Sequence, residues 1–170
     1  MSNEPNTPNE TERLVFREWI PDDLPVFHSI CSDPGVMKFV GDGETWTESQ
    51  SHTFIDQAIC ASRTDGFCQW PLVLKSNRQL IGYCGLVKSS SGLEIGWRLA
   101  AEFWRQGLAT EAVSSVLHYA EGTLRASRIT ATIQADNLPS IKLATGSGFE
   151  VESTLHRNGR NVLLLTRVTK

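Results

Sequence analysis

Residues 104–112 read WRQGLATEA and follow a short strand-like run at Leu93–Leu99. A helix is predicted from residue 108 onward, because apolar residues recur every four positions, which is the spacing of one helical face. These residues are Leu108, Ala112, Val116 and Ala120. Small residues at 107 and 109 leave the first backbone N–H groups of that helix open to a bulky anion, which the helix dipole attracts. The segment therefore predicts a phosphate-binding turn between a strand and a helix.

The turn differs from the two common nucleotide-binding motifs. It lacks the Gly-Lys-Ser/Thr of an NTP-binding P-loop and the Gly-x-Gly-x-x-Gly of dinucleotide folds. Two interpretations remain for Gly107 and Ala109: a phosphate cradle of another kind, or an ordinary tight turn before a helix.

The motif Trp104-x-x-Gly107-x-Ala109 resembles the acyl-CoA pyrophosphate loop of the GNAT N-acetyltransferases, whose general pattern is Arg/Gln-x-x-Gly-x-Gly/Ala. The branch of this family that acetylates the N-termini of ribosomal proteins often has Trp-Gly-x-Gly-x-Ala-Thr-Glu-Ala. The chain is similar to that pattern except at Arg105, where the branch prefers glycine.

A second match to the family lies downstream. Asn137-x-x-Ser140 is followed by Gly148-Phe149 at the family's spacing, and the resemblance extends from about Arg13 to the end of the chain. It implies an α+β fold, the GNAT acyl-CoA N-acyltransferase fold. Such a fold has a mixed, mostly antiparallel sheet of about seven strands, flanked by about four helices.

The patterns along the chain fit one α+β domain. Strands are predicted at 13–20, 68–75, 79–88, 93–99, 128–134, 149–154 and 161–168, and helices at 21–32, 47–63, from 108, and at 137–147. Residues 36–46 are predicted to be irregular, and Pro71 suggests an edge strand or a bulge. Residues 1–11 are polar and predict a flexible N-terminal tail, so a single N-acetyltransferase domain is expected at residues 12–170.

Composition excludes several other classes. The net charge is −3 with no block of lysine and arginine, which argues against nucleic acid as a partner. No run of eighteen apolar residues predicts a membrane span, and residues 1–11 have no signal-peptide core. The four cysteines and four histidines show no metal-ligand spacing, so no metal is expected. We interpret the cysteines as reduced thiols in a cytoplasmic protein.

The resemblance implies acetyl-CoA as cosubstrate. Its pyrophosphate would bind the amide cluster and side chains of the loop, namely Arg105, Gln106, Gly107, Leu108, Ala109 and Thr110. In the family the preceding strand splays from its neighbour, so the backbones of Ile95 and Trp97 would contact the pantetheine and the acetyl carbonyl. Arg105 has an alternative interpretation as a solvated surface residue.

Catalytic roles are expected for Glu94 and Ser140. Glu94 lies on the splayed strand and would take a proton from the amine, directly or through water, although a solvent-facing carboxylate is the plainer interpretation. Many GNAT enzymes have a tyrosine acid at the position of Ala144, and in its absence Ser140 or water would give a proton to the thiolate. Asn137 would bind the pantetheine, or act as a helix N-cap, or both.

The predicted activity is direct transfer of an acetyl group from acetyl-CoA to a primary amine, with no acyl-enzyme. The resemblance makes a protein N-terminus one candidate acceptor but does not fix the acceptor, and the aromatic ring of Trp46 would line the acceptor pocket. A small-molecule amine is the alternative acceptor, and a non-catalytic acyl-CoA-binding module is the alternative class. The expected partners are therefore acetyl-CoA and an amine, with no nucleic acid and no membrane, and the protein is a monomer or a homodimer.

Overall fold

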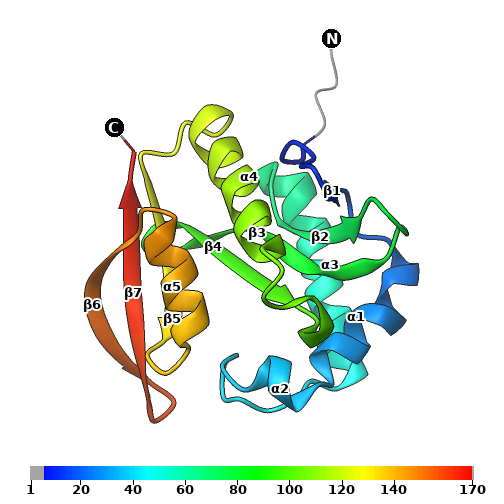
Figure 1. Cartoon of the computed structure of the whole chain (residues 1–170), viewed down its shortest axis with the longest axis horizontal. Coiled ribbons are helices and arrows are strands. Elements are labelled where there is room, and N and C mark those ends of the chain that lie inside the picture. The colour runs from blue at the N-terminus through cyan, green and yellow to red at the C-terminus, as the bar shows by residue number, and fades with distance from the viewer. Residues whose placement is uncertain (1–5, 170) are drawn as a thin grey trace.

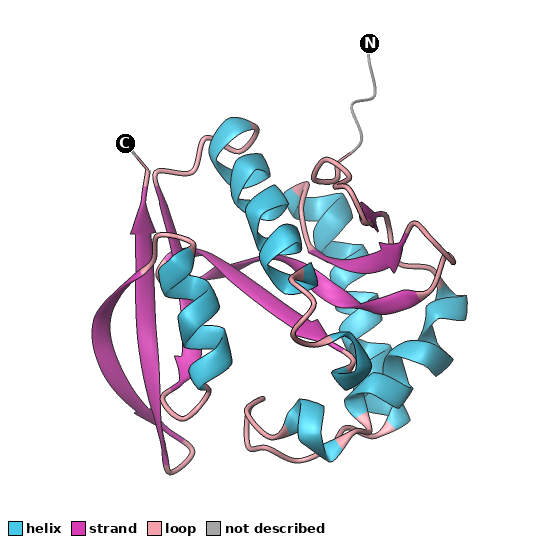
Figure 2. Cartoon of the chain, viewed as in Figure 1, coloured by secondary structure: helices cyan, strands magenta, loops and turns pink. Residues whose placement is uncertain are grey.

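Seven strands form one sheet in the order β1-β2-β3-β4-β5-β7-β6 in the computed structural model, which describes residues 6–169 (Figures 1 and 2). The strands are β1 (Leu14–Phe16), β2 (Gln69–Leu74), β3 (Leu80–Ser89), β4 (Gly92–Leu99), β5 (Arg128–Gln134), β6 (Glu150–Arg157) and β7 (Arg160–Val168). β4 pairs with β5 in parallel, and the other five pairs are antiparallel. The mixed, mostly antiparallel sheet of seven strands is therefore confirmed.

The helices cover both faces of this sheet. They are α1 (Leu24–Cys31), α2 (Pro34–Met37), α3 (Glu48–Asp65), α4 (Leu108–Gly122) and α5 (Leu138–Gly146), with short 3-10 helices at Pro21–Asp23 and Ala101–Phe103. Figure 1 shows α4 and α5 on the same side of the sheet, while α3 crosses behind β2 and β3. The four predicted helices are present, and α3 begins with the predicted Thr47–Gln50 capping box.

The helix α2 lies partly in a segment that was predicted to be irregular. Asp33 caps it by accepting a hydrogen bond from the backbone N–H of Gly35 at 2.8 Å, and Pro34 occupies its first turn. Four residues make one turn, which is too short to show a helical period. The sequence pattern therefore could not reveal this helix.

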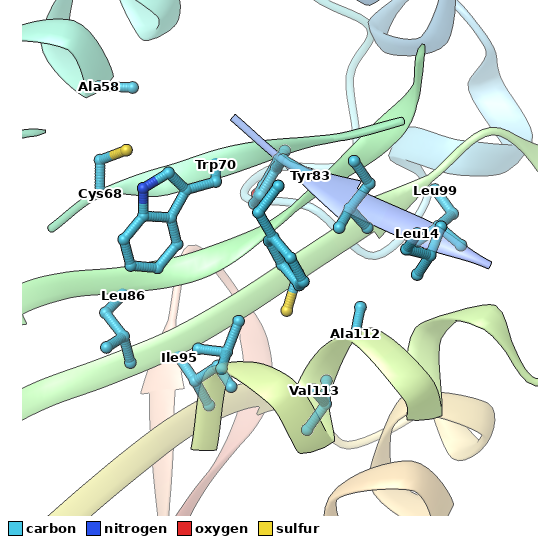
Figure 3. Packing of buried hydrophobic residues seen from close by; sticks show 14 of the residues in the cluster. Leu14, Ala58, Cys68, Trp70, Tyr83, Leu86, Ile95, Leu99, Ala112 and Val113 are labelled. Atoms are coloured by element: carbon cyan, nitrogen blue, oxygen red, sulfur yellow. The ribbon is translucent and has the colours of Figure 1, made fainter. Parts of the chain in front are cut away.

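The core lies on both sides of the central strands. Figure 3 shows Ile95 and Leu99 of β4 on the side of the sheet where Ala112 and Val113 of α4 pack, and all four side chains are buried. Close packing also explains a glycine inside β3. A Cβ on Gly85 would lie 2.1 Å from the carbonyl oxygen of Cys68, the residue before β2, so only glycine fits there.

Strand β2 contains the predicted irregularity. Its register against β3 shifts between Leu72 and Val73, next to Pro71. Strand β1 is shorter than predicted and pairs with Leu72–Leu74 only, so Pro71 lies beyond its end. A missing N–H at Pro71 therefore costs no hydrogen bond to β1.

The described part of the N-terminal segment packs on the domain. Trp70 Nε1 donates a hydrogen bond to the carbonyl oxygen of Asn6 at 3.1 Å, and Ser115 Oγ of α4 donates to that of Asn9 at 2.6 Å. Residues 1–5 of the predicted tail lie outside the described residues. Within residues 6–169, no helix is both long enough and apolar enough to cross a membrane.

Candidate active site

The N-terminus of α4 presents free backbone amides. Gly107 is the N-cap residue with φ +78°, a left-handed conformation that favours glycine. In the described part of the chain, no protein acceptor receives the N–H groups of residues 107–110. Ala109 keeps the first turn small, so these groups and the helix dipole are available to an anion. The loop thus has the geometry of a phosphate cradle.

Three side-chain contacts hold this loop in place. Trp104 Nε1 donates to the carbonyl oxygen of Leu99 at 2.9 Å, and Gln106 Nε2 donates to that of Glu102 at 2.9 Å. Arg13 Nη1 donates to the carbonyl oxygen of Gln106 at 2.8 Å. In a trans peptide the C=O and the next N–H point in opposite directions, so this bond turns the N–H of Gly107 away from Arg13.

Arg13 is itself held by Glu111 in the first turn of α4. Arg13 Nε and Nη2 each lie 2.8 Å from Glu111 Oε2, and its backbone N–H lies 2.8 Å from Oε1, which also accepts from Thr11 Oγ1. Partial burial works to raise the pKa of Glu111, but the hydrogen bonds from Thr11 and Arg13 outweigh it and hold that pKa below its ordinary value. The contact joins residues far apart in sequence, and sequence reasoning missed it.

Arg105 adopts a left-handed backbone with φ +59°, and its side chain is exposed. This conformation costs a non-glycine residue roughly 1–2 kcal/mol. The glycine that the ribosomal-protein branch prefers at this position would avoid this cost, so Arg105 adopts a backbone conformation that suits glycine better.

Strands β4 and β5 separate just beyond the cradle. They pair only at Leu93–Ile129 and Glu94–Thr130, and Figure 1 shows them diverging from that point. Backbone groups alternate in direction along a strand. The N–H of Ala100 bonds to the carbonyl oxygen of Ile81 on β3, so even-numbered residues of β4 face β3 and odd-numbered residues face β5. Ile95 lies where the pairing ends, and the backbone groups of Trp97 face β5 beyond it.

Glu94 and Ser140 lie on opposite faces of the sheet. Glu94 is half-buried on the face that carries Arg98, because alternate residues of a strand share a face. Ser140 is in the first turn of α5, on the face that α4 covers (Figure 1). Within residues 6–169, neither the Glu94 carboxylate nor the Ser140 hydroxyl makes a side-chain hydrogen bond, so both are available to a ligand.

Asn137 acts as an N-cap. Its Oδ1 accepts from the backbone N–H of Ser140 at 3.3 Å, which matches the structural interpretation of this residue and leaves its Nδ2 for a ligand. Ala144 is fully buried on the inner face of α5. The position of the family's common tyrosine acid is therefore packed with a methyl group.

Trp46 belongs to an aromatic cluster on the face of the sheet opposite α4. Its ring centroid lies 5.8 Å from that of Phe54 and 6.4 Å from that of Phe27, and it is partly exposed. The guanidinium of Arg98 lies 4.4 Å from the Trp46 centroid and 5.3 Å from that of Tyr83. Sequence reasoning missed Arg98, although an arginine between apolar positions of a central strand is a signal.

The segment that leads to Trp46 is tied to the far half of the sheet. Gln134 Nε2 at the end of β5 donates to the carbonyl oxygen of Gly41 at 2.9 Å. Arg160 on β7 donates to the carbonyl oxygens of Lys38 and Asp42 at 3.0 and 2.8 Å and to Gln134 Oε1 at 2.9 Å. These bonds place residues 38–42 across the open end of the β4–β5 splay, and sequence reasoning missed both side chains.

The predicted residues thus form two groups. The cradle, Asn137 and Ser140 lie on the side of α4 and α5, while Glu94 and Trp46 lie on the opposite side. Within residues 6–169, no three histidine, cysteine, aspartate or glutamate side chains are grouped so that they could hold a metal ion.

A splayed β4–β5 pair beside an amide-lined helix start defines the class of acetyltransferase folds that the sequence resembled. The chain belongs to the GNAT family, because the family model described as "Acetyltransferase (GNAT) domain" matches residues 13–150. It is therefore an N-acetyltransferase in the general sense of that family.

Individual relatives agree with this assignment. The chain is 31% identical over 148 residues to the uncharacterized N-acetyltransferase p20 of Bacillus licheniformis, covering 85% of this chain and 83% of p20. Its fold is similar to that of a GNAT-family acetyltransferase from Bacillus anthracis, with a TM-score of 0.84 and 24% identity over 95% of this chain and 98% of the other. The fold is also similar to that of RimL, a ribosomal L7/L12 alpha-N-protein acetyltransferase in complex with coenzyme A. There the TM-score is 0.80 and the identity 13%, over 94% of this chain and 96% of that one.

Proposed function

We propose that this protein uses acetyl-CoA as the acetyl donor and transfers the acetyl group directly to a primary amine. The observation that carries the proposal is the free amide cluster at residues 107–110 beside the unpaired edge of β4. The amides and the helix dipole would bind the pyrophosphate, with Arg105 adding a charge-assisted contact. The pantetheine would then reach the splay, where the backbones of Ile95 and Trp97 bind it and the acetyl carbonyl.

The two faces of the sheet suit the two proton transfers of this reaction. The amine attacks the thioester carbonyl, the C–S bond breaks, and CoA leaves as a thiolate. Glu94, on the face with Trp46, would take the proton from the amine directly or through water. Ser140, on the face with α5, would give a proton to the thiolate, while Asn137 contacts the pantetheine.

Other observations bear on which amine accepts the acetyl group. The resemblance of the loop to the ribosomal-protein branch and the fold shared with RimL support a protein N-terminus. A small-molecule amine is the second candidate. Arg98, a buried cation beside Trp46, favours an acceptor that carries a negative charge.

Thermal unfolding with acetyl-CoA, free CoA or ATP tests the donor. At a hundredfold excess over Kd, a single bound ligand stabilises a protein by about 2.7 kcal/mol, which is a shift on the order of 5–10 °C at this size. We expect a shift with acetyl-CoA and CoA and none with ATP. The absence of a shift at millimolar acetyl-CoA would make the loop a simple turn. A shift without CoA release with any amine would instead indicate a non-catalytic acyl-CoA-binding module.

A further inference from the structure

Arg98 is a buried cation in the central strand β4. Only 6% of the residue is exposed, although it projects from a central strand toward α1. Its Nη1 donates to Cys31 Sγ at 3.1 Å, and its buried Nε has no hydrogen-bond partner within residues 6–169. In the described part of the chain, no carboxylate lies within ion-pair distance of the guanidinium. A buried guanidinium normally pairs with an acid, so this arrangement is unusual.

The surrounding groups compensate the charge only in part. The rings of Trp46 and Tyr83 provide cation–π attraction, and sulfur is a weak acceptor. Burial raises the pKa of Cys31, against the opposing effect of Arg98, and burial also raises the pKa of Tyr83. Both groups are therefore neutral at physiological pH, and neither supplies the missing negative charge.

The position of Arg98 links this cation to the acceptor side of the site. It follows Trp97, whose backbone groups face the splay, and it shares a face of β4 with Glu94. Trp46 and Phe54, which surround this region, are both partly exposed. The Trp46 ring lies over the guanidinium, so a ligand on this face would reach Arg98 by displacing this partly exposed ring.

We infer that Arg98 binds a carboxylate on the amine acceptor, while the aromatic cluster of Trp46, Phe54 and Tyr83 covers the rest of the acceptor. This inference rests on the proposed function and narrows it: the acceptor is an amine that also carries an acid, and a cationic polyamine is disfavoured. The carboxylate belongs either to a free amino acid or to the acidic first residue of a peptide. Arg98 is then the group that selects the acceptor.

Acetylation kinetics with matched pairs of acceptors test this role. The pairs are free amino acids against their carboxamides, and amide-capped peptides that begin with Asp or Glu against those that begin with Asn or Gln. We expect the wild type to prefer the acid of at least one kind of pair. Arg98→Met should lower kcat/KM for that acid by roughly tenfold to a hundredfold and change it little for the matched amide. For the acid, the kcat/KM of Arg98→Lys should lie between those of the wild type and Arg98→Met, because lysine keeps the charge and lacks the planar guanidinium.

The control is Arg63→Met, since Arg63 is exposed on α3 and forms no ion pair within residues 6–169. It should leave both members of each pair unchanged. A selectivity loss confined to free amino acids identifies the α-carboxylate as the ligand, and one confined to peptides identifies the first side chain. Equal loss for the acid and the amide in Arg98→Met, or a wild-type preference for the amide, overturns the inference.

Thermal unfolding without ligand separates a binding role from a structural one. Replacing an unpaired buried charge by an apolar side chain is often neutral or stabilising, so Arg98→Met should unfold at the wild-type temperature or above it. A large decrease would show that Arg98 supports the fold and would refute the binding role. If no amine releases CoA, the proposed function fails and takes this inference with it. If amines are acetylated without preference for acids, only the role of Arg98 fails.

Discussion

Removing the charge of Glu111 tests whether Arg13, the residue before β1, positions the loop at residues 104–107. In Glu111→Gln, Arg13 loses its ion pair, and its Nη1 is no longer held against the carbonyl oxygen of Gln106. The side chains are 18% exposed at Glu111 and 44% exposed at Arg13, so the pair is discounted toward the value of a surface ion pair. The hydrogen bonds from Thr11 Oγ1 and the Arg13 backbone N–H also weaken, because their acceptor is no longer charged. Together these losses should destabilise the protein by about 1–2 kcal/mol.

The stability difference between the wild type and Glu111→Gln should shrink as the pH falls. The folded-state pKa of Glu111 is lowered from 4.5, so its contribution is complete above 4.5 and is lost as the pH falls through the lower folded value. Urea unfolding of wild type and variant should therefore show a constant difference at pH 6–8 and a shrinking one below 4.5. An equal difference at pH 7 and in strong acid would refute the electrostatic reasoning.

Glu121→Gln is the matched control, because Glu121 pairs with Arg167 at 2.7 Å near the other end of α4. Both variants should lose stability. For Glu111→Gln, a loss of about 1–2 kcal/mol should lower the unfolding temperature by roughly 2–8 °C. Only Glu111→Gln should also weaken acetyl-CoA binding, measured by calorimetry. If both variants bind acetyl-CoA equally well, Arg13 does not position the loop.

Further predictions concern four residues of the proposed site. Gly107→Glu should abolish the thermal shift with acetyl-CoA, whereas Gly107→Ala, which shares the backbone strain without the bulk or charge, should retain a smaller one; equal shifts would exclude the cradle. Arg105→Gly should raise the unfolding temperature slightly by relieving its left-handed backbone and weaken acetyl-CoA binding by removing a cation; unchanged affinity would make Arg105 a surface residue. Ser140→Ala should lower kcat more than it weakens acetyl-CoA binding, and a loss in binding alone would make Ser140 a structural or cofactor-contact residue. Glu94→Gln should lower kcat by removing the proposed base, and an unchanged kcat would make Glu94 a solvent-facing carboxylate.

Much of the fold could be predicted because local patterns matched the final structure. The four-residue period from Leu108 predicted α4, and the Thr47–Gln50 pair predicted the start of α3. The motif around Gly107 identified the family and with it the sheet. The prediction was wrong where an element is short: β1 covers only Leu14–Phe16, and α2 has one turn, so neither shows a full period.

The sequence by itself determined most of the strands and helices, the position of the turn before α4 that we propose binds phosphate, and the family of the chain, because these depend on residues close together in the chain. The tertiary structure alone decided what those elements bring together. Arg13 reaches Glu111 across 98 positions, and Arg160 reaches Lys38 across 122. Among residues 6–169, no carboxylate packs beside Arg98, and no local sequence pattern predicts this. Long-range contacts and missing partners depend on how strands and helices pack, so only the folded chain reveals them.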